Sequence, residues 1–174
     1  MTRRAEAGLT LVELMLVLAL AAVSILIALD SFSVWNGREE MRGAVYTIQT
    51  FLHLAQAEAA TRSRACRFLV DTASRQIQVV DLNDPANTGD DIVVTSAKLP
   101  AAVTFADPSG GTPVTLELQS GTTYGTTFSS DGAVSAGEGV VCVSGNNLFS
   151  RVTVYGAGGT RVERWDGSAW NQGS

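Results

Sequence analysis

The chain has 174 residues, a length that predicts one domain of ordinary size. Apolar residues make up 45% of it and charged residues 17%, with 17 glycines. This composition excludes a disordered polar tail, a collagen and a charge-rich coiled coil. The net charge is −5, and because nucleic-acid binding depends on clustered Lys and Arg, general nucleic-acid binding is disfavoured.

The N-terminal segment is divided sharply into a polar and an apolar part. Residues 1–8 are polar and carry Arg3 and Arg4, whereas residues 9–29 contain a single charge, that of Glu13. At 1.5 Å per residue, the second part is long enough for a helix to cross a hydrocarbon core about 30 Å thick. By the positive-inside rule, the two arginines hold the leader in the cytoplasm, so residues 30–174 are expected outside it.

The apolar segment and its single charge, Glu13, permit several interpretations. A cleaved secretory signal fits poorly, because the apolar run exceeds about 7–15 residues and residues 30–33 lack an A-x-A site. An uncleaved anchor, carrying a membrane-anchored binding domain, stays open but does not explain Glu13. A carboxylate costs roughly 2.5–3.5 kcal/mol near the centre of a membrane helix. We expect its partner to be the free amino terminus of a neighbouring subunit cut after Gly8.

A family resemblance lies in the segment Gly8-Leu9-Thr10-Leu11-Val12-Glu13-Leu14-Met15. It resembles the class III signal of type IV pilins and type II secretion pseudopilins. The resemblance implies that an integral-membrane prepilin peptidase removes residues 1–8 after Gly8, that Leu9 is then N-methylated, and that Glu13 helps subunits to dock. The usual first mature residue of the family is Phe, so Leu9 is an apolar departure from the pattern.

Residues 30–62 are predicted to continue the helix in amphipathic form. Apolar side chains recur every three or four residues along one stripe, opposite a mostly polar face. The stripe consists of Met41, Val45, Ile48, Leu52, Ala55 and Ala59. Such a stripe needs an apolar partner, which we expect residues 63–174 to supply.

Residues 63–174 have the pattern of a β-rich globular domain. Short runs of β-favouring residues alternate with turns rich in Gly, Asn, Asp, Ser and Pro, which favours antiparallel sheet over βαβ units. The expected strands are 66–70, 76–80, 92–95, 103–106, 114–119, 126–129, 140–143, 149–155 and 160–165. The predicted fold class is therefore α+β, a long N-terminal helix packed on an antiparallel head domain, and the resemblance to pilins implies the same fold.

Weaker similarities extend the resemblance over the head domain. Residues 99–105, 127–132 and 151–164 resemble a strand entry, a turn and a terminal hairpin of the GspH/FimT group of minor pseudopilins. The resemblance implies a non-enzymatic minor subunit, anchored in the bacterial inner membrane by one span with its head in the periplasm. It would assemble with other pilin or pseudopilin subunits into a periplasmic or surface filament. Type II secretion is our preferred setting, and a minor type IV pilin for assembly, adhesion or DNA uptake is the alternative.

The sequence contains no arrangement typical of catalysis or of a cofactor. His53 is the only histidine and lies beside the apolar stripe, and no GxSxG motif follows a strand. The ligands of a zinc site are missing too. The oxygen-rich loop 81–91 is interpreted as a solvated loop, with a calcium site as the alternative. The glycine-rich residues 156–159 lie between two strands, which predicts a hairpin turn rather than a phosphate loop.

Two pairs of residues leave alternatives open. Cys66 and Cys142 would lie in an oxidising compartment, so they form either a disulfide or two buried thiols. Some FimT-like minor pilins bind DNA through a C-terminal Gly-Arg-x-Arg motif, which makes Arg161 and Arg164 candidate DNA contacts. The spacing differs here, and Glu163 intervenes. Because Arg161 and Glu163 would share one face of a strand, a surface ion pair is our preferred interpretation.

Overall fold

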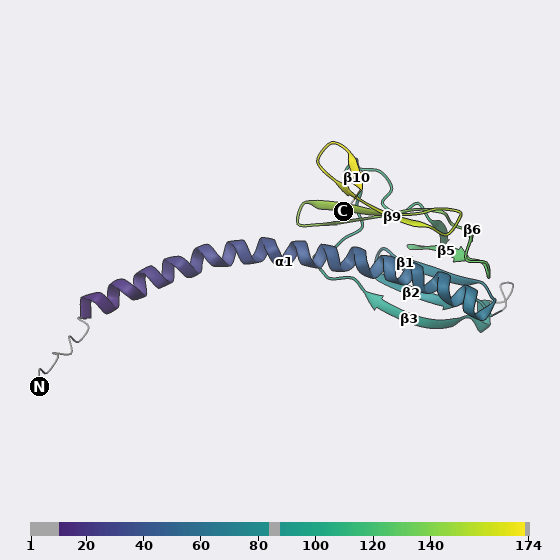
Figure 1. The fold of residues 1–174 in the computed structure, drawn as a ribbon, viewed down its shortest axis with the longest axis horizontal. Coiled ribbons are helices and arrows are strands. Elements are labelled where there is room, and N and C mark those ends of the chain that lie inside the picture. The colour runs from purple at the N-terminus through teal and green to yellow at the C-terminus, as the bar shows by residue number, and fades with distance from the viewer. Residues whose placement is uncertain (1–10, 84–87, 173–174) are drawn as a thin grey trace, which may run out of the picture. The chain divides into compact units, whose positions relative to one another are not determined.

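The computed structural model describes residues 11–83 and 88–172, with the backbone alone for residues 26–34 and 88. Helix α1 spans Leu11–Arg62 (Figure 1). The chain divides into two compact units, Met1–Asn36 and Gly37–Ser174, and all strands belong to the second. The expected leader 1–8 and Leu9 lie outside the described residues.

In the first unit, α1 exposes apolar side chains on every face. Leu11, Val12, Met15, Leu18 and Ile25 are all more than half exposed. Within the described part of the chain, no helix is both long and apolar enough to qualify as a membrane span. The expected span 9–29 begins before those residues and ends among side chains that the structure does not describe.

In the second unit, the amphipathic stripe of α1 is buried as predicted. Ile48, Leu52, Ala55 and Ala59 have no exposed surface, and Met41 and Val45 are at most 9% exposed. Each large apolar side chain that is fully buried stabilises the fold by about 1.5–3 kcal/mol. Burial of this stripe fixes the helix against the strands.

The strands form two antiparallel sheets. The first sheet has the order β3-β2-β1-β5-β4, with β6 beside β5, and the second has the order β10-β9-β8-β7. The elements of the first are β1 (Cys66–Asp71), β2 (Gln76–Asp81), β3 (Ile92–Lys98), β4 (Glu117–Ser120), β5 (Thr123–Phe128) and β6 (Val134–Ala136). The elements of the second are β7 (Gly139–Gly145), β8 (Leu148–Val154), β9 (Thr160–Trp165) and β10 (Trp170–Gln172). A short 3-10 helix, η1 (Thr88–Asp90), precedes β3.

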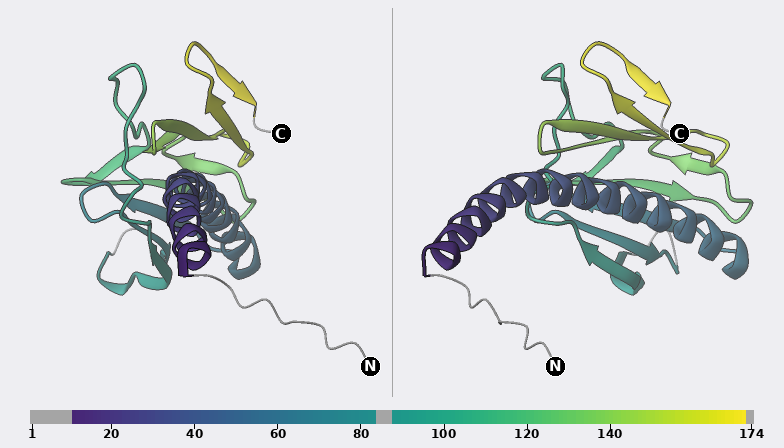
Figure 2. Two further views of the ribbon diagram at one scale, coloured as in Figure 1. Left: turned by 90° about the vertical axis from the view of Figure 1, so that its left-hand side faces the viewer. Right: turned by 60° about the vertical axis from the view of Figure 1, so that its left-hand side comes forward.

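One hydrophobic core joins α1 to both sheets. Figure 2 shows the second sheet on one side of the C-terminal part of α1 and β1–β3 on the other. Phe68 and Ile77 reach this core from the first sheet, and Val143 and Val152 reach it from the second. The predicted α+β class, a helix packed on antiparallel sheet, is confirmed.

Two strand predictions need correction. Residues 103–106 form no strand, because the Val103 N–H donates to the Pro100 carbonyl in a turn and only Thr104 forms a bridge, to Ser144. The strand expected at 114–119 begins only at Glu117, after an isolated bridge of Val114. Pro100, Pro108 and Pro113, which lack the N–H that a ladder needs, lie just before or between these two runs.

The two cysteines are free and buried. Cys66 opens β1 in the first sheet, and Cys142 lies in β7 of the second, where its Sγ is 3.7 Å from Asp107 Oδ2. Burial, with the Asp81 carboxylate, raises the pKa of Cys66 to about 11. Burial, with Asp107, raises that of Cys142 to about 12. In this structure the two cysteines are therefore separate buried thiols, one in each sheet, which corresponds to the second of the two alternatives.

Gln56 of α1 lies against two glycines, Gly132 in a turn of the first sheet and Gly158 in a turn of the second. Gln56 Nε2 donates to the Gly132 carbonyl at 2.8 Å. Gly158, in the β8–β9 turn, has φ +82°, and a Cβ there would lie 2.2 Å from the Gly132 oxygen. The Gly158 N–H donates to the Tyr155 carbonyl at 2.8 Å, so the predicted hairpin turn at residues 156–159 is confirmed. Only glycine fits this position without moving the backbone.

The substitution Gly158→Ala should therefore destabilise the head domain. We expect a loss of about 2–4 kcal/mol in the free energy of unfolding, from the left-handed backbone and the clash. The control is Gly159→Ala, since a Cβ at Gly159 meets nothing within 4 Å. Urea unfolding of the full chain in a neutral detergent, followed by tryptophan fluorescence, measures both, and equal stability of the two variants would contradict the packing described.

The two thiols should also resist alkylation in the folded protein. The thiolate is the reactive form, and the raised pKa values leave both groups protonated at pH 8. Intact-mass measurement after iodoacetamide treatment should find no adduct on the native chain and two after denaturation. Repeating the mass measurement without a reductant tests for a disulfide. A disulfide-bonded chain would gain no adduct, native or denatured, until it was reduced.

Candidate functional site: a docking helix and an arginine-lined groove

The predicted processing and docking residues fall at the beginning of α1. Glu13 lies in the first turn of the helix, and the large apolar side chains beside it, among them Val12, Leu14 and Met15, are more than half exposed. Gly8 and Leu9 lie outside the described residues. A helix that is apolar on every face is typical of a segment buried in a membrane or in a bundle of like helices.

The two candidate DNA-contact residues lie on opposite faces of β9. Successive residues of a strand alternate between faces, so a separation of three residues places Arg161 and Arg164 on different sides. Arg161 Nε lies 3.6 Å from Glu163 Oε1. The expected ion pair on one face is thus confirmed, and the two arginine side chains extend from opposite faces of the strand.

Glu163 is held by a further cation from the neighbouring strand. It is 7% exposed, and Arg151 Nε donates to its Oε2 at 2.7 Å. The Arg151 guanidinium also lies 4.5 Å from the centre of the Trp170 ring. Glu163 therefore forms ion pairs with both Arg151 and Arg161, on the face of β9 opposite to Arg164. These ion pairs hold β8 and β9 together.

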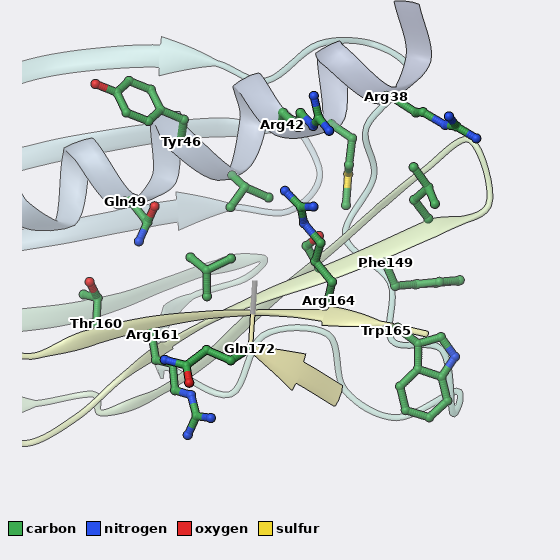
Figure 3. A pocket seen from close by; sticks show the side chains of 15 residues that line it. Arg38, Arg42, Tyr46, Gln49, Phe149, Thr160, Arg161, Arg164, Trp165 and Gln172 are labelled. Atoms are coloured by element: carbon green, nitrogen blue, oxygen red, sulfur yellow. The ribbon is translucent and has the colours of Figure 1, made fainter. Parts of the chain in front are cut away.

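A groove lies between α1 and the second sheet, with a volume of about 760 Å³. Its charged lining consists of Arg38, Arg42, Arg161 and Arg164, and it contains no acidic residue. Figure 3 shows Arg38 and Arg42 on α1 and Arg164 extending from β9 toward that helix, whereas Arg161 and Gln172 point away from it.

The groove has an apolar floor and an aromatic rim. Met41 and Val45 from α1 and Val162 from β9 contribute aliphatic surface, and Tyr46 and Trp165 contribute rings. Sequence reasoning missed this site because the helix and β9 are far apart in the chain. The sequence offers two separate signals, namely the spacing of Arg38 and Arg42, one helical turn apart on one face, and the pair Arg161 and Arg164, but no local pattern connects them.

Other residues singled out from the sequence form contacts within the fold. His53 is exposed, with Nε2 3.3 Å from Thr160 Oγ1. Asp81, fully buried, pairs with Arg62 at 2.9 Å and Arg64 at 3.6 Å, which ties the end of α1 to β2. Among the described residues, no cluster of His, Cys, Asp or Glu is suited to a metal ion. Part of the loop 81–91, residues 84–87, lies outside the described ranges.

Comparisons with protein families match both halves of the chain. Residues 44–158 match the family model described as Type II transport protein GspH. Residues 3–29 match the model described as Prokaryotic N-terminal methylation motif. No curated protein matches the chain at a significant level. The two family models thus cover the predicted span 9–29 and most of the predicted head domain 63–174.

Two solved structures have a similar fold. The type IV minor pilin FimU of Pseudomonas aeruginosa aligns with a TM-score of 0.52 and 15% identity, over 79% of this chain and 97% of its own. The minor pseudopilin EpsH of the Vibrio cholerae type 2 secretion system aligns with a TM-score of 0.50 and 16% identity, over 71% of this chain and 95% of its own. The helix on two antiparallel sheets is therefore the pilin fold. The chain belongs to the GspH family of type II transport proteins, which are structural and non-enzymatic.

Proposed function

We propose that this chain is a minor subunit of a type II secretion filament, processed after Gly8 and N-methylated at Leu9. One observation carries the proposal: a methylation motif at residues 3–29 and a GspH head at residues 44–158 occur on one chain. The motif is typical of prepilins that are anchored in the inner membrane with the head in the periplasm. Assembly with other pilins and processing by the prepilin peptidase follow from the family.

The exposed apolar surface of α1 supports a role in assembly. A helix apolar on all sides is stable only where lipid or other helices cover it. In the membrane, lipid covers it, and in a filament, the helices of neighbouring subunits do. Transfer between these two environments costs little, because both are apolar. The segment 9–29 would thus hold the precursor in the membrane and later form the filament core.

Glu13 would then guide docking. Cleavage after Gly8 creates a new amino terminus at Leu9, and the positive charge of that group is complementary to the Glu13 carboxylate of an adjacent subunit. In an apolar filament core, an unpaired charge is costly, so pairing favours one register between helices. This role depends on charge and therefore predicts a specific defect when the carboxylate is removed.

The variant Glu13→Ala should insert into the membrane and fold but enter filaments poorly. We expect at least about a tenfold loss of the assembled fraction, since the partner charge is left buried and unpaired. Cross-linking in cells, followed by comparison of the assembled and membrane pools, measures this fraction.

The matched control is Glu117→Ala, on β4 of the first sheet. Glu117 is exposed, does not line the groove and accepts a hydrogen bond from the Gln119 side chain at 3.2 Å, so its loss should leave assembly unchanged. Equal assembly of Glu13→Ala and wild type would contradict the docking role.

The alternative assembly is a type IV pilus, in which the chain would be a minor pilin. The fold similarity to FimU is the observation that favours this alternative. Deletion of the gene separates the two. Loss of exoprotein secretion with normal surface pili supports the secretion filament, and loss of surface pili with normal secretion supports the minor pilin. If the chain were an uncleaved membrane-anchored binding domain, deletion would affect neither.

A further inference from the structure

The lining of the groove carries more positive charge than the ion pairs among the described residues neutralise. Among the described residues, neither Arg38 nor Arg164 forms an ion pair. Arg42 pairs with Glu39, one turn away on the helix. The chain as a whole has a net charge of −5, so this local excess of cations is opposite in sign to the rest of the molecule. A guanidinium presents five donors in a planar fork that matches a carboxylate.

The apolar floor of the groove restricts which kinds of ligand could bind there. Met41 is 3% exposed and Val45 is 9% exposed, and Val162 packs against the same core. Leu148, at 39% exposure, adds an aliphatic side chain at the margin. A ligand that fills the groove would therefore place aliphatic groups against the floor and anionic groups against the arginines. A polypeptide in which acidic and aliphatic residues alternate has this pattern, because successive side chains of an extended chain point to opposite sides.

The described geometry favours such a peptide over a nucleic acid. Arg161, although part of the lining, points away from α1 and is paired with Glu163, so the arginines do not form a continuous track for phosphates. Trp165 packs edge-on against Trp170, with ring centres 5.4 Å apart. A long polyanion would also cross the acidic remainder of the protein. A short segment interacts mainly with charges within a Debye length of about 8–10 Å.

We propose that the groove between α1 and the second sheet binds an acidic, aliphatic segment of a neighbouring filament subunit, held by Arg38, Arg42 and Arg164. This inference rests on the proposed function, because a filament holds neighbouring subunits beside the groove at high effective concentration. A contact of modest intrinsic affinity is then sufficient. The groove would set which subunit follows this one, whereas Glu13 would set the register of the helices.

The test measures peptide binding by the full-length chain in a neutral detergent. The probe is a short fluorescent peptide in which Glu alternates with Leu, and the comparison probes replace Glu by Lys or use oligothymidine. Fluorescence anisotropy should show binding of the Glu–Leu peptide that weakens with added salt. The double variant Arg38→Glu, Arg164→Glu should weaken it by at least about tenfold, because both attractions become repulsions.

Two control variants separate charge in the groove from charge in general. Lys98→Glu reverses an exposed charge on β3 of the first sheet and should leave the affinity unchanged. The double variant Arg38→Gln, Arg164→Gln removes the charges without inverting them and should give an intermediate loss. Because Arg38 and Arg164 are both exposed, the variants should keep the fold, which circular dichroism verifies.

Two results would overturn the inference. The first is no binding of the Glu–Leu peptide, or binding that is equal in wild type and in the double variant. The second is tighter, arginine-dependent binding of oligothymidine, which would assign the groove to nucleic acid. Peptide binding does not depend on processing at Gly8. A chain that is never cleaved would thus contradict the proposed function without changing this affinity.

Discussion

Burial of one stripe of α1 against two separate sheets is the constraint on which the rest of the head domain depends. Ile48, Leu52 and Ala55 are fully buried, and the core that encloses them includes strands of both sheets. Without the helix, each sheet would expose an apolar face to water. The groove is a consequence of this packing, because it lies where the helix and the second sheet approach each other.

The same helix meets two different requirements along its length. From Gly37 onward, its buried apolar residues form one stripe, and the chain's own strands cover them. In residues 11–25, apolar side chains occupy every face, and within this single chain they are exposed. Covering the second surface requires lipid or other subunits. Coverage of this second surface is therefore the property on which the proposed role in a filament depends.

Much of this fold could be predicted from local sequence pattern. The stripe from Met41 to Ala59 repeats with helical spacing, and the run at residues 76–80 is β-favouring, so both elements were predicted near their observed bounds. The strands β6 and β10 were not predicted, because three residues are too few to show an alternation. The groove was missed for another reason. It depends on the long-range packing that places Arg38 of α1 and Arg164 of β9 in the lining of one groove, which no local pattern reports.

The central claim is that the chain is a processed filament subunit, and the state of its amino terminus tests it most directly. The measurement is the N-terminal sequence and intact mass of the protein extracted from membranes, with and without the prepilin peptidase. The account predicts a chain that starts at methylated Leu9 when the peptidase is present and at Met1 when it is absent. A chain that starts at Met1 in both samples would contradict it.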